Sequence, residues 1–112
     1  MDTNIRVWLY DILNALHEIE GFTGINQFTY NLYQKDLRTK RAVERNIEII
    51  GEALNRISQR DETIFISHAR KIIDTRNRII HGYDSVSDEI IWSILKHHLP
   101  VLKVEIEFIL GE

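Results

Sequence analysis

Apolar residues recur at intervals of three and four along most of the chain, the spacing that places them on one face of a helix. In the first half, this pattern predicts a first helix closed by Gly21 and a shorter second helix that follows Gly24. A long third helix is expected from about Leu37 to Ile57. Its apolar seam, the most regular in the chain, consists of Val43, Ile47, Ile50, Leu54 and Ile57. Such a seam packs against other helices.

Gly51 interrupts this long predicted helix. Glycine inside a helix costs about 1 kcal/mol relative to alanine. We therefore expect that the missing side chain allows another helix to approach closely. Two acidic residues of the same helix, Glu44 and Glu52, are interpreted as surface charges or as members of ion pairs between helices.

The second half continues with a fourth predicted helix that begins near Ile66 and stops near His81. Gly82 suits the left-handed backbone position just past a helix end. Ser85, followed by Asp88 three residues later, resembles a capping box for the next helix.

The last predicted helix contains Pro100, which must kink or divide it because proline has no backbone N–H group. Strand-like alternation does not persist for more than a few residues, and no repeat or linker separates parts of the sequence. We therefore predict an all-α fold, an antiparallel helical bundle of four to five helices in a single domain spanning residues 1–112.

The charged residues are unevenly distributed along the sequence, so the net charge alone does not describe the binding surfaces. The net charge of −3 argues against a nucleic-acid partner, because phosphate binding usually requires a basic surface. Residues 35–45 and 70–78 are nevertheless locally positive. If a nucleic acid binds, the basic residues of the first stretch are the candidates for contacts with its phosphates: Lys35, Arg38, Lys40, Arg41 and Arg45.

The sequence contains no cysteine, no secretory signal pattern and no apolar run of membrane-spanning length. We therefore expect a cytoplasmic protein that does not associate with membranes. Because no metal-ligand spacing or phosphate-binding glycine loop occurs either, we expect neither a metal nor another cofactor.

An arginine occupies the apolar side of the fourth predicted helix. Arg76 lies one turn from Ile73 and from Ile80, at the centre of the apolar stripe. A lone arginine in such a place is usually in a buried ion pair, or its charged end reaches solvent. However, Asn77 and His81 share a polar edge beside it, and a histidine there can exchange a proton at neutral pH.

Arg76 and His81 do not converge on a single ideal helix, because their side chains point about 140° apart. A joint site therefore needs either a frayed helix end or a second chain. A two-fold dimer that packs the fourth helix against its own copy would bring two arginines and two histidines around one cleft. The exposed apolar seam that such a dimer needs is available in this sequence.

The segment RNRIIHGY, residues 76–83, resembles the signature of the HEPN domains, and in particular of the HepT-like toxins of toxin–antitoxin pairs. That signature is an arginine, a polar residue, three variable residues and a histidine, and the HepT-like branch adds a tyrosine two residues later. In this sequence the corresponding residues are Arg76, Asn77, His81 and Tyr83. Residues 38–55 and 88–102 also resemble this branch, whereas residues 61–72 lack the Pro-Trp-like entry that relatives often carry.

The resemblance implies a metal-independent endoribonuclease that acts as a homodimer with the motif at its interface. In such chemistry the ribose 2′-hydroxyl is the nucleophile, His81 moves its proton, and Arg76 stabilises charge on the phosphate oxygens. Asn77 would orient His81 or the substrate. The need for a 2′-hydroxyl restricts cleavage to RNA.

The resemblance also implies a protein partner, a nucleotidyltransferase antitoxin of the MntA type that transfers AMP to Tyr83. The added phosphodiester would place negative charge beside Arg76 and silence the enzyme. Two other functions stay open from the sequence. One is a non-catalytic nucleotide- or partner-binding helical subunit of a nucleotidyltransferase complex, and the other is a purely structural dimer.

Overall fold

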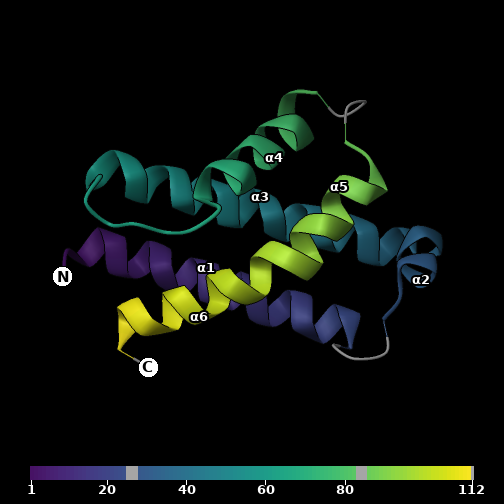
Figure 1. Cartoon of the computed structure of the whole chain (residues 1–112), viewed down its shortest axis with the longest axis horizontal. Helices are drawn as coiled ribbons and strands as arrows, with labels where there is room; N and C mark the ends of the chain where they lie inside the picture. Colours follow the sequence, from purple (N-terminus) through teal and green to yellow (C-terminus); the bar gives the residue numbers. More distant parts are fainter. Residues whose placement is uncertain (25–27, 83–85, 112) are drawn as a thin grey trace.

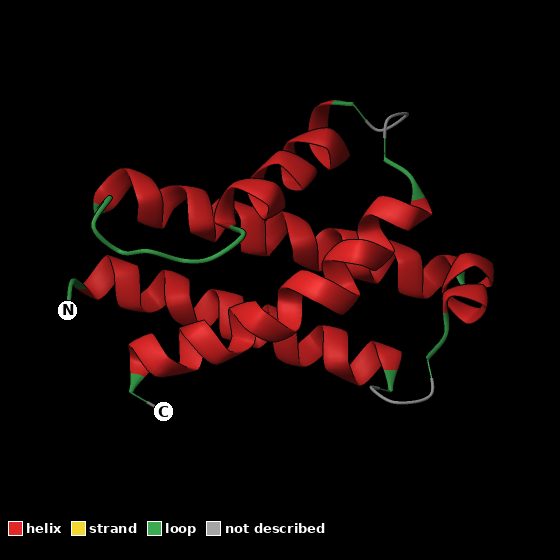
Figure 2. Ribbon diagram, viewed as in Figure 1, coloured by secondary structure: helices red, strands yellow, loops and turns green. Residues whose placement is uncertain are grey.

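The computed structural model describes residues 1–24, 28–82 and 86–111. Within these residues the chain forms helices and connecting turns, with no strand, so the predicted all-α class is confirmed (Figures 1 and 2). The elements are α1 (Thr3–Thr23), α2 (Tyr30–Lys35), α3 (Leu37–Arg60), α4 (Ala69–His81), α5 (Asp88–Ser93), η2 (Ile94–His98) and α6 (Leu99–Leu110).

The two long helices α1 and α3 lie side by side and run in opposite directions (Figure 1). Helix α4 packs on α3, and α6 packs on α1. Each of the two long helices is therefore in contact with one shorter helix from the second half of the chain. All five residues of the predicted α3 seam are buried, as the periodicity predicts. The interior is dominated by isoleucine and leucine from α1, α3 and α6.

The short helix α2 is anchored to this bundle by aromatic side chains. The Thr29 hydroxyl caps α2 by accepting a hydrogen bond from the backbone N–H of Leu32. Tyr33 is completely buried, and its ring packs against those of Phe28 and Trp92. Helix α2 therefore joins the core through one tyrosine rather than through a long apolar seam.

The ends of the first helix differ from the prediction. The Asp2 carboxylate caps α1 by accepting hydrogen bonds from the backbone N–H groups of Asn4 and Ile5. Gly21 lies inside α1, and Gly24, with φ of 62°, closes the helix instead. The prediction that Gly21 closes the helix is therefore wrong, because only Gly24 adopts the left-handed conformation that ends a helix.

Helix α4 ends at His81 as predicted, but it begins at Ala69 rather than near Ile66. Gly82 has φ of −136°, so the predicted left-handed position after α4 is wrong. The cap of α5 is Ser87, whose hydroxyl accepts a hydrogen bond from the Ile90 N–H. The predicted cap, Ser85, lies outside the described residues.

The last predicted helix is divided, as the position of Pro100 required. Between α5 and α6, the element η2 is a π-helical turn in which the Leu99 N–H donates to the Ile94 carbonyl, five residues earlier. Pro100 then lies in the first turn of α6. A wide turn before the proline suits its ring, which would clash with a carbonyl in a regular α-helix.

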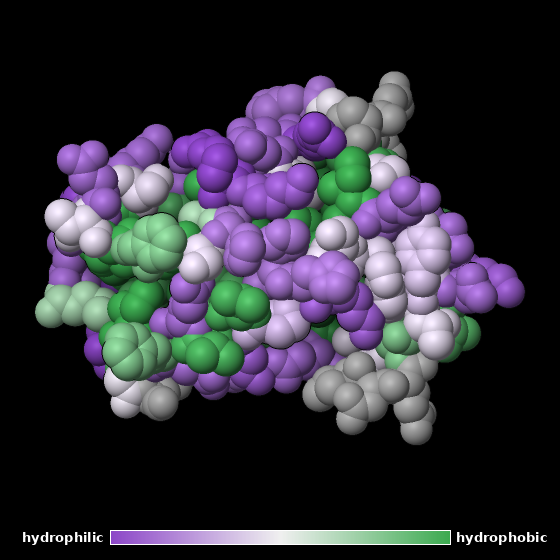
Figure 3. Space-filling view, in the orientation of Figure 1, coloured by the Kyte–Doolittle hydropathy of each residue, from purple (hydrophilic) through white to green (hydrophobic). Residues whose placement is uncertain are grey.

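The outer side of α6 is apolar. Figure 3 shows hydrophobic surface over α6 and over the connection between α3 and α4. The strongly exposed apolar side chains of these segments are Phe65, Val101, Val104 and Phe108. None of the described helices combines the length and the hydropathy needed to cross a membrane.

Candidate functional site

Arg76 lies at the point where α4 comes closest to α3. A Cβ atom added to Gly51 would lie 2.5 Å from the Cβ and 2.9 Å from the Cγ of Arg76. The expectation that Gly51 permits a close helix contact is therefore confirmed. The contact places the base of the arginine side chain directly on the α3 backbone.

The guanidinium of Arg76 is held by two side chains. Its Nη2 atom donates to Oε2 of Glu52 at 2.6 Å, and its Nη1 atom donates to Oδ1 of Asn77 at 2.8 Å. The interpretation of Glu52 as a partner in an ion pair between helices is confirmed. The Arg76 side chain is 21% exposed and the Glu52 side chain is 37% exposed, so the pair is partly shielded from solvent, more on its arginine side.

Glu52 has a second basic partner. Its Oε1 atom accepts a hydrogen bond from Nε of Arg56 at 2.9 Å. Both carboxylate oxygens are therefore occupied, each by a different arginine. The Nε atom of Arg76 is buried and has no hydrogen-bond partner among the described residues.

A hollow of about 280 Å³ opens beside this pair, between α1, α3 and α4. Three arginines, three acidic residues and four apolar residues line it: Arg45, Arg56, Arg76, Asp11, Glu48, Glu52, Trp8, Ile49, Ala53 and Ile80. The positive and negative side chains balance, so a phosphate entering the hollow would have to exchange with carboxylates already paired to the arginines.

His81 is exposed at the last residue of α4 and is not among the residues that line this hollow. Asn77 is also exposed, although its side chain contacts Arg76. Ile80, which lies between Arg76 and His81 in sequence, is 42% exposed. A single chain thus brings Arg76 and Asn77 together and leaves His81 outside. Tyr83 lies outside the described residues.

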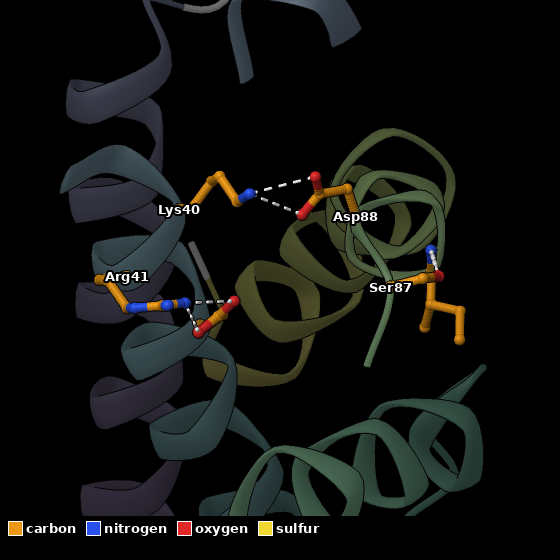
Figure 4. A network of polar contacts seen from close by, with 6 residues as sticks. Lys40, Arg41, Ser87 and Asp88 are labelled. Atoms are coloured by element: carbon orange, nitrogen blue, oxygen red, sulfur yellow. Dashed lines mark hydrogen bonds and ion pairs between the residues drawn. The ribbon is translucent and has the colours of Figure 1, made fainter. Parts of the chain in front are cut away.

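The five predicted RNA contacts occupy different surroundings. Lys40 bridges from α3 to Asp88 at the start of α5, with an Nζ to Oδ1 distance of 3.0 Å (Figure 4). Arg41 pairs with Glu44 at 3.1 Å, and Glu44 is buried. Lys40 therefore has a structural role in joining two helices, whatever its part in binding RNA.

The other three predicted contacts are exposed. Lys35 and Arg38 lie on either side of the junction between α2 and α3. Arg45 is 71% exposed, with Glu48 at 3.8 Å, and it is the only member of the predicted set that lines the hollow. Whether these residues contact RNA stays a prediction.

Several residues that line the hollow were not predicted from the sequence, among them Arg56, Asp11 and Glu48. The spacing of Glu52 and Arg56, four residues apart on one helix, is the signal that could have found the first of them. Among the described residues, no group of three or more histidine, aspartate or glutamate side chains could hold a metal ion.

Comparison with known proteins adds an independent observation. A family model described as "Ribonuclease HepT-like" matches residues 12–109. "Putative RNase MJ0127" from Methanocaldococcus jannaschii is 34% identical, covering 97% of this chain and 89% of that protein. "Probable ribonuclease HepT" from Thermococcus cleftensis is 32% identical, covering 96% of each. No solved structure matches the chain significantly.

Proposed function

Because the chain belongs to the ribonuclease HepT-like family, we propose that it is a metal-independent endoribonuclease that uses Arg76 and His81 of a homodimer. The observation that carries this proposal is the half-buried guanidinium of Arg76, which two side chains hold at the edge of an open hollow. A permanently charged, planar group fixed in this way suits a phosphate, because it needs no rearrangement as charge develops.

In the proposed reaction, neutral His81 accepts the proton of a ribose 2′-hydroxyl. The 2′-oxygen then bonds to phosphorus as the bond to the 5′-oxygen breaks, which leaves a 2′,3′-cyclic phosphate and a 5′-hydroxyl. Water donates the proton that the 5′-oxygen needs, so each site uses one histidine. Arg76 stabilises the negative charge on the non-bridging oxygens, and the link to Arg76 gives Asn77 a supporting role.

The homodimer is supported by the separation of the two groups within one chain. Arg76 faces the hollow, whereas His81 is exposed at the helix end and does not line it. Ile80 between them is 42% exposed, as expected of an apolar residue that another chain covers. A two-fold axis beside α4 would place Arg76 of one copy next to His81 of the other.

We also propose that the chain is the toxin of a toxin–antitoxin pair, neutralised by an MntA-type nucleotidyltransferase that transfers AMP to Tyr83. Tyr83 follows His81 by two residues, so a phosphodiester on its hydroxyl would lie near the proposed site. Its negative charge would compete with the substrate phosphate for Arg76. The intact mass of the purified protein, with and without the transferase and ATP, tests this modification.

Cleavage of RNA in the presence of a chelator tests the proposed activity. We expect wild-type protein of unmodified mass to cut RNA and to leave the all-deoxy strand of the same sequence intact. His81→Ala and Arg76→Ala should each lose about 10²-fold or more in rate. His17→Ala and Arg70→Ala, changes at exposed positions outside the hollow, are matched controls and should retain activity.

Cleavage that survives in His81→Ala, or that disappears on removal of metals, would contradict this mechanism. If unmodified wild-type protein cuts no RNA, the alternative of a non-catalytic nucleotide- or partner-binding subunit is favoured instead.

Mixed dimers test the shared site separately. If each site combines Arg76 of one chain with His81 of the other, an Arg76→Ala chain paired with a His81→Ala chain has one intact site. Mixing the two inactive variants in equal amounts should then restore about a quarter of wild-type activity, because half of the dimers are mixed and each has one working site. No recovery after verified subunit exchange would show that both groups come from the same chain.

A further inference from the structure

The geometry points to Glu52 as the positioning residue that fixes Arg76 for phosphate binding. The inference rests on the proposed function, and it assigns a role to a residue outside the arginine–histidine motif. Four observations carry it: the contact at Gly51, the short ion pair, the second arginine on Glu52, and the partial shielding of the pair from solvent.

The position of Glu52 follows from the helix contact beside it. The Cβ of Arg76 lies against Gly51, so the arginine side chain starts on the α3 surface and extends along it. The next residue of α3 is Glu52, which the guanidinium reaches at 2.6 Å. A bulkier residue than glycine at position 51 would push the arginine away from this carboxylate. The glycine and the glutamate therefore act together to set where Arg76 lies.

The carboxylate itself is held in place. Arg56, one turn further along α3, donates from Nε to Oε1 of Glu52 at 2.9 Å, and Arg76 uses Oε2. A carboxylate fixed at both oxygens provides a more rigid anchor than one free to rotate. Two arginines share one glutamate, so these three groups together keep a net charge of +1, although Asp11 and Glu48 balance the charge of the hollow as a whole.

The guanidinium keeps donors for a substrate. It has five N–H groups, of which one is bound to Glu52 and one to Asn77. Each of Nη1 and Nη2 retains a second N–H, whereas the Nε atom is buried and out of reach of a substrate. Glu52 and Asn77 thus restrain both ends of the group while leaving N–H groups that can bind phosphate oxygens.

Two other roles are conceivable for Glu52, and each predicts a different effect on stability and RNA cleavage when Glu52 is replaced. If it only joined α3 to α4, its loss would reduce stability and would affect activity only as far as the protein unfolds. If it blocked Arg76 against substrate, its loss would raise activity. The positioning role predicts a lower kcat in fully folded protein, because a misplaced cation stabilises the transition state less well.

The test uses Glu52→Ala and Glu52→Gln, with Glu18→Gln as the control. Glu18 is exposed on α1 and is not among the residues that line the hollow. With a chelator present and at a temperature where all variants are folded, Glu52→Ala should lower kcat by about tenfold or more. Glu52→Gln, which can still accept a hydrogen bond, should recover part of this loss. Glu18→Gln should leave kcat unchanged.

Activity alone would not separate a failure of this inference from a failure of the proposed function, so a second measurement follows Arg76 directly. A restrained guanidinium gives resolved, slowly exchanging side-chain N–H signals in NMR spectra. We expect the Arg76 signal to be lost in Glu52→Ala and kept in Glu18→Gln. Arg76→Lys identifies which signal belongs to Arg76.

Active wild-type protein whose kcat is unchanged or raised by Glu52→Ala would overturn the positioning role and leave the ribonuclease function intact. Wild-type protein that cuts no RNA would overturn the proposed function and with it the catalytic part of this inference. An Arg76 signal that survives in Glu52→Ala would overturn the structural part in either case.

Discussion

The contact between Gly51 and Arg76 predicts a specific penalty for adding one methyl group. In Gly51→Ala the new Cβ would start 2.5 Å from the Cβ of Arg76. Carbon atoms in good contact are about 3.5–4.0 Å apart, so α4 would have to move by roughly 1 Å. The third neighbour, the backbone oxygen of Ile72 at 3.5 Å, is at an ordinary van der Waals distance, so the clash is with the Arg76 side chain.

A second glycine, Gly21, makes it possible to separate the cost of the clash from the gain in helix propensity. Overpacking of this kind costs about 1–3 kcal/mol, while replacing glycine with alanine inside a helix gains up to about 1 kcal/mol. Gly21 also lies within a helix, and a Cβ added there meets no atom within 4 Å. Gly21→Ala should therefore show the gain alone. The difference in unfolding free energy between the two variants should be about 1–3 kcal/mol, the cost of the clash.

Urea unfolding followed by circular dichroism measures this difference, with protein concentration held constant because a dimer would make stability depend on it. RNA cleavage provides a second readout, since a shift of about 1 Å in Arg76 can reduce the rate by about 10²-fold. Gly21→Ala should leave cleavage unchanged. Equal unfolding free energies for the two alanine variants would refute the close contact between α3 and α4.

Three further predictions concern stability and RNA binding. The Tyr33 hydroxyl is buried without a partner among the described residues, and burial raises its pKa, so Tyr33→Phe should unfold at the same urea concentration or higher. A clearly lower midpoint would contradict this. Hydrogen bonds from the Ile5 N–H and from Arg60 hold the pKa of Asp2 below its ordinary value of 3.8. The charged form is thus favoured in the folded state, and its stabilisation is present above pH 3.8 and lost as the pH falls through the lowered pKa. Asp2→Asn, which can still cap α1, should flatten the loss of stability measured in unfolding experiments across this acidic range, and an unchanged pH profile would count against the argument. Finally, Lys40→Ala should lower the unfolding free energy by about 1 kcal/mol, because Lys40 joins α3 to α5. Arg45→Ala should change the unfolding free energy by no more than about 0.5 kcal/mol and should weaken RNA binding in a gel shift. A larger loss of stability in Arg45→Ala than in Lys40→Ala would contradict this assignment.

Helix faces were predictable from the sequence, but helix ends were less so. The seam of α3 is buried as its spacing predicted, because a period of three and four residues admits only one interior face. In contrast, Gly21 and Gly24 are both reasonable terminators, and only the backbone angle at Gly24 decides between them. The same holds for Ser85 and Ser87 before α5, where a hydrogen bond across one turn identifies Ser87 as the cap.

The candidate site also has a part that could be predicted from the sequence and a part that could not. The spacing of Arg76, Asn77 and His81 is visible in the sequence, and the resemblance to a ribonuclease family agrees with the family that matches the chain. The pairing of Arg76 with Glu52 was not predictable in detail, because the two residues are 24 positions apart and meet only through the register of α4 on α3. Gly51 indicated that such a contact exists without showing which side chain would receive the arginine.

The π-helical turn η2 has a consequence for chain length. The buried positions run Ile91, Ile94, Leu99, Leu102 and Ile106, so the apolar repeat jumps by five residues at this turn and by three or four elsewhere. Without the jump, a regular helix would direct His98 toward α1 in place of Leu99. One residue fewer between Ile94 and Leu99 would give an ordinary step of four. This turn is therefore the place where a shorter relative would keep the same interior, whereas a deletion within α3 would rotate every later residue of that helix by about 100°.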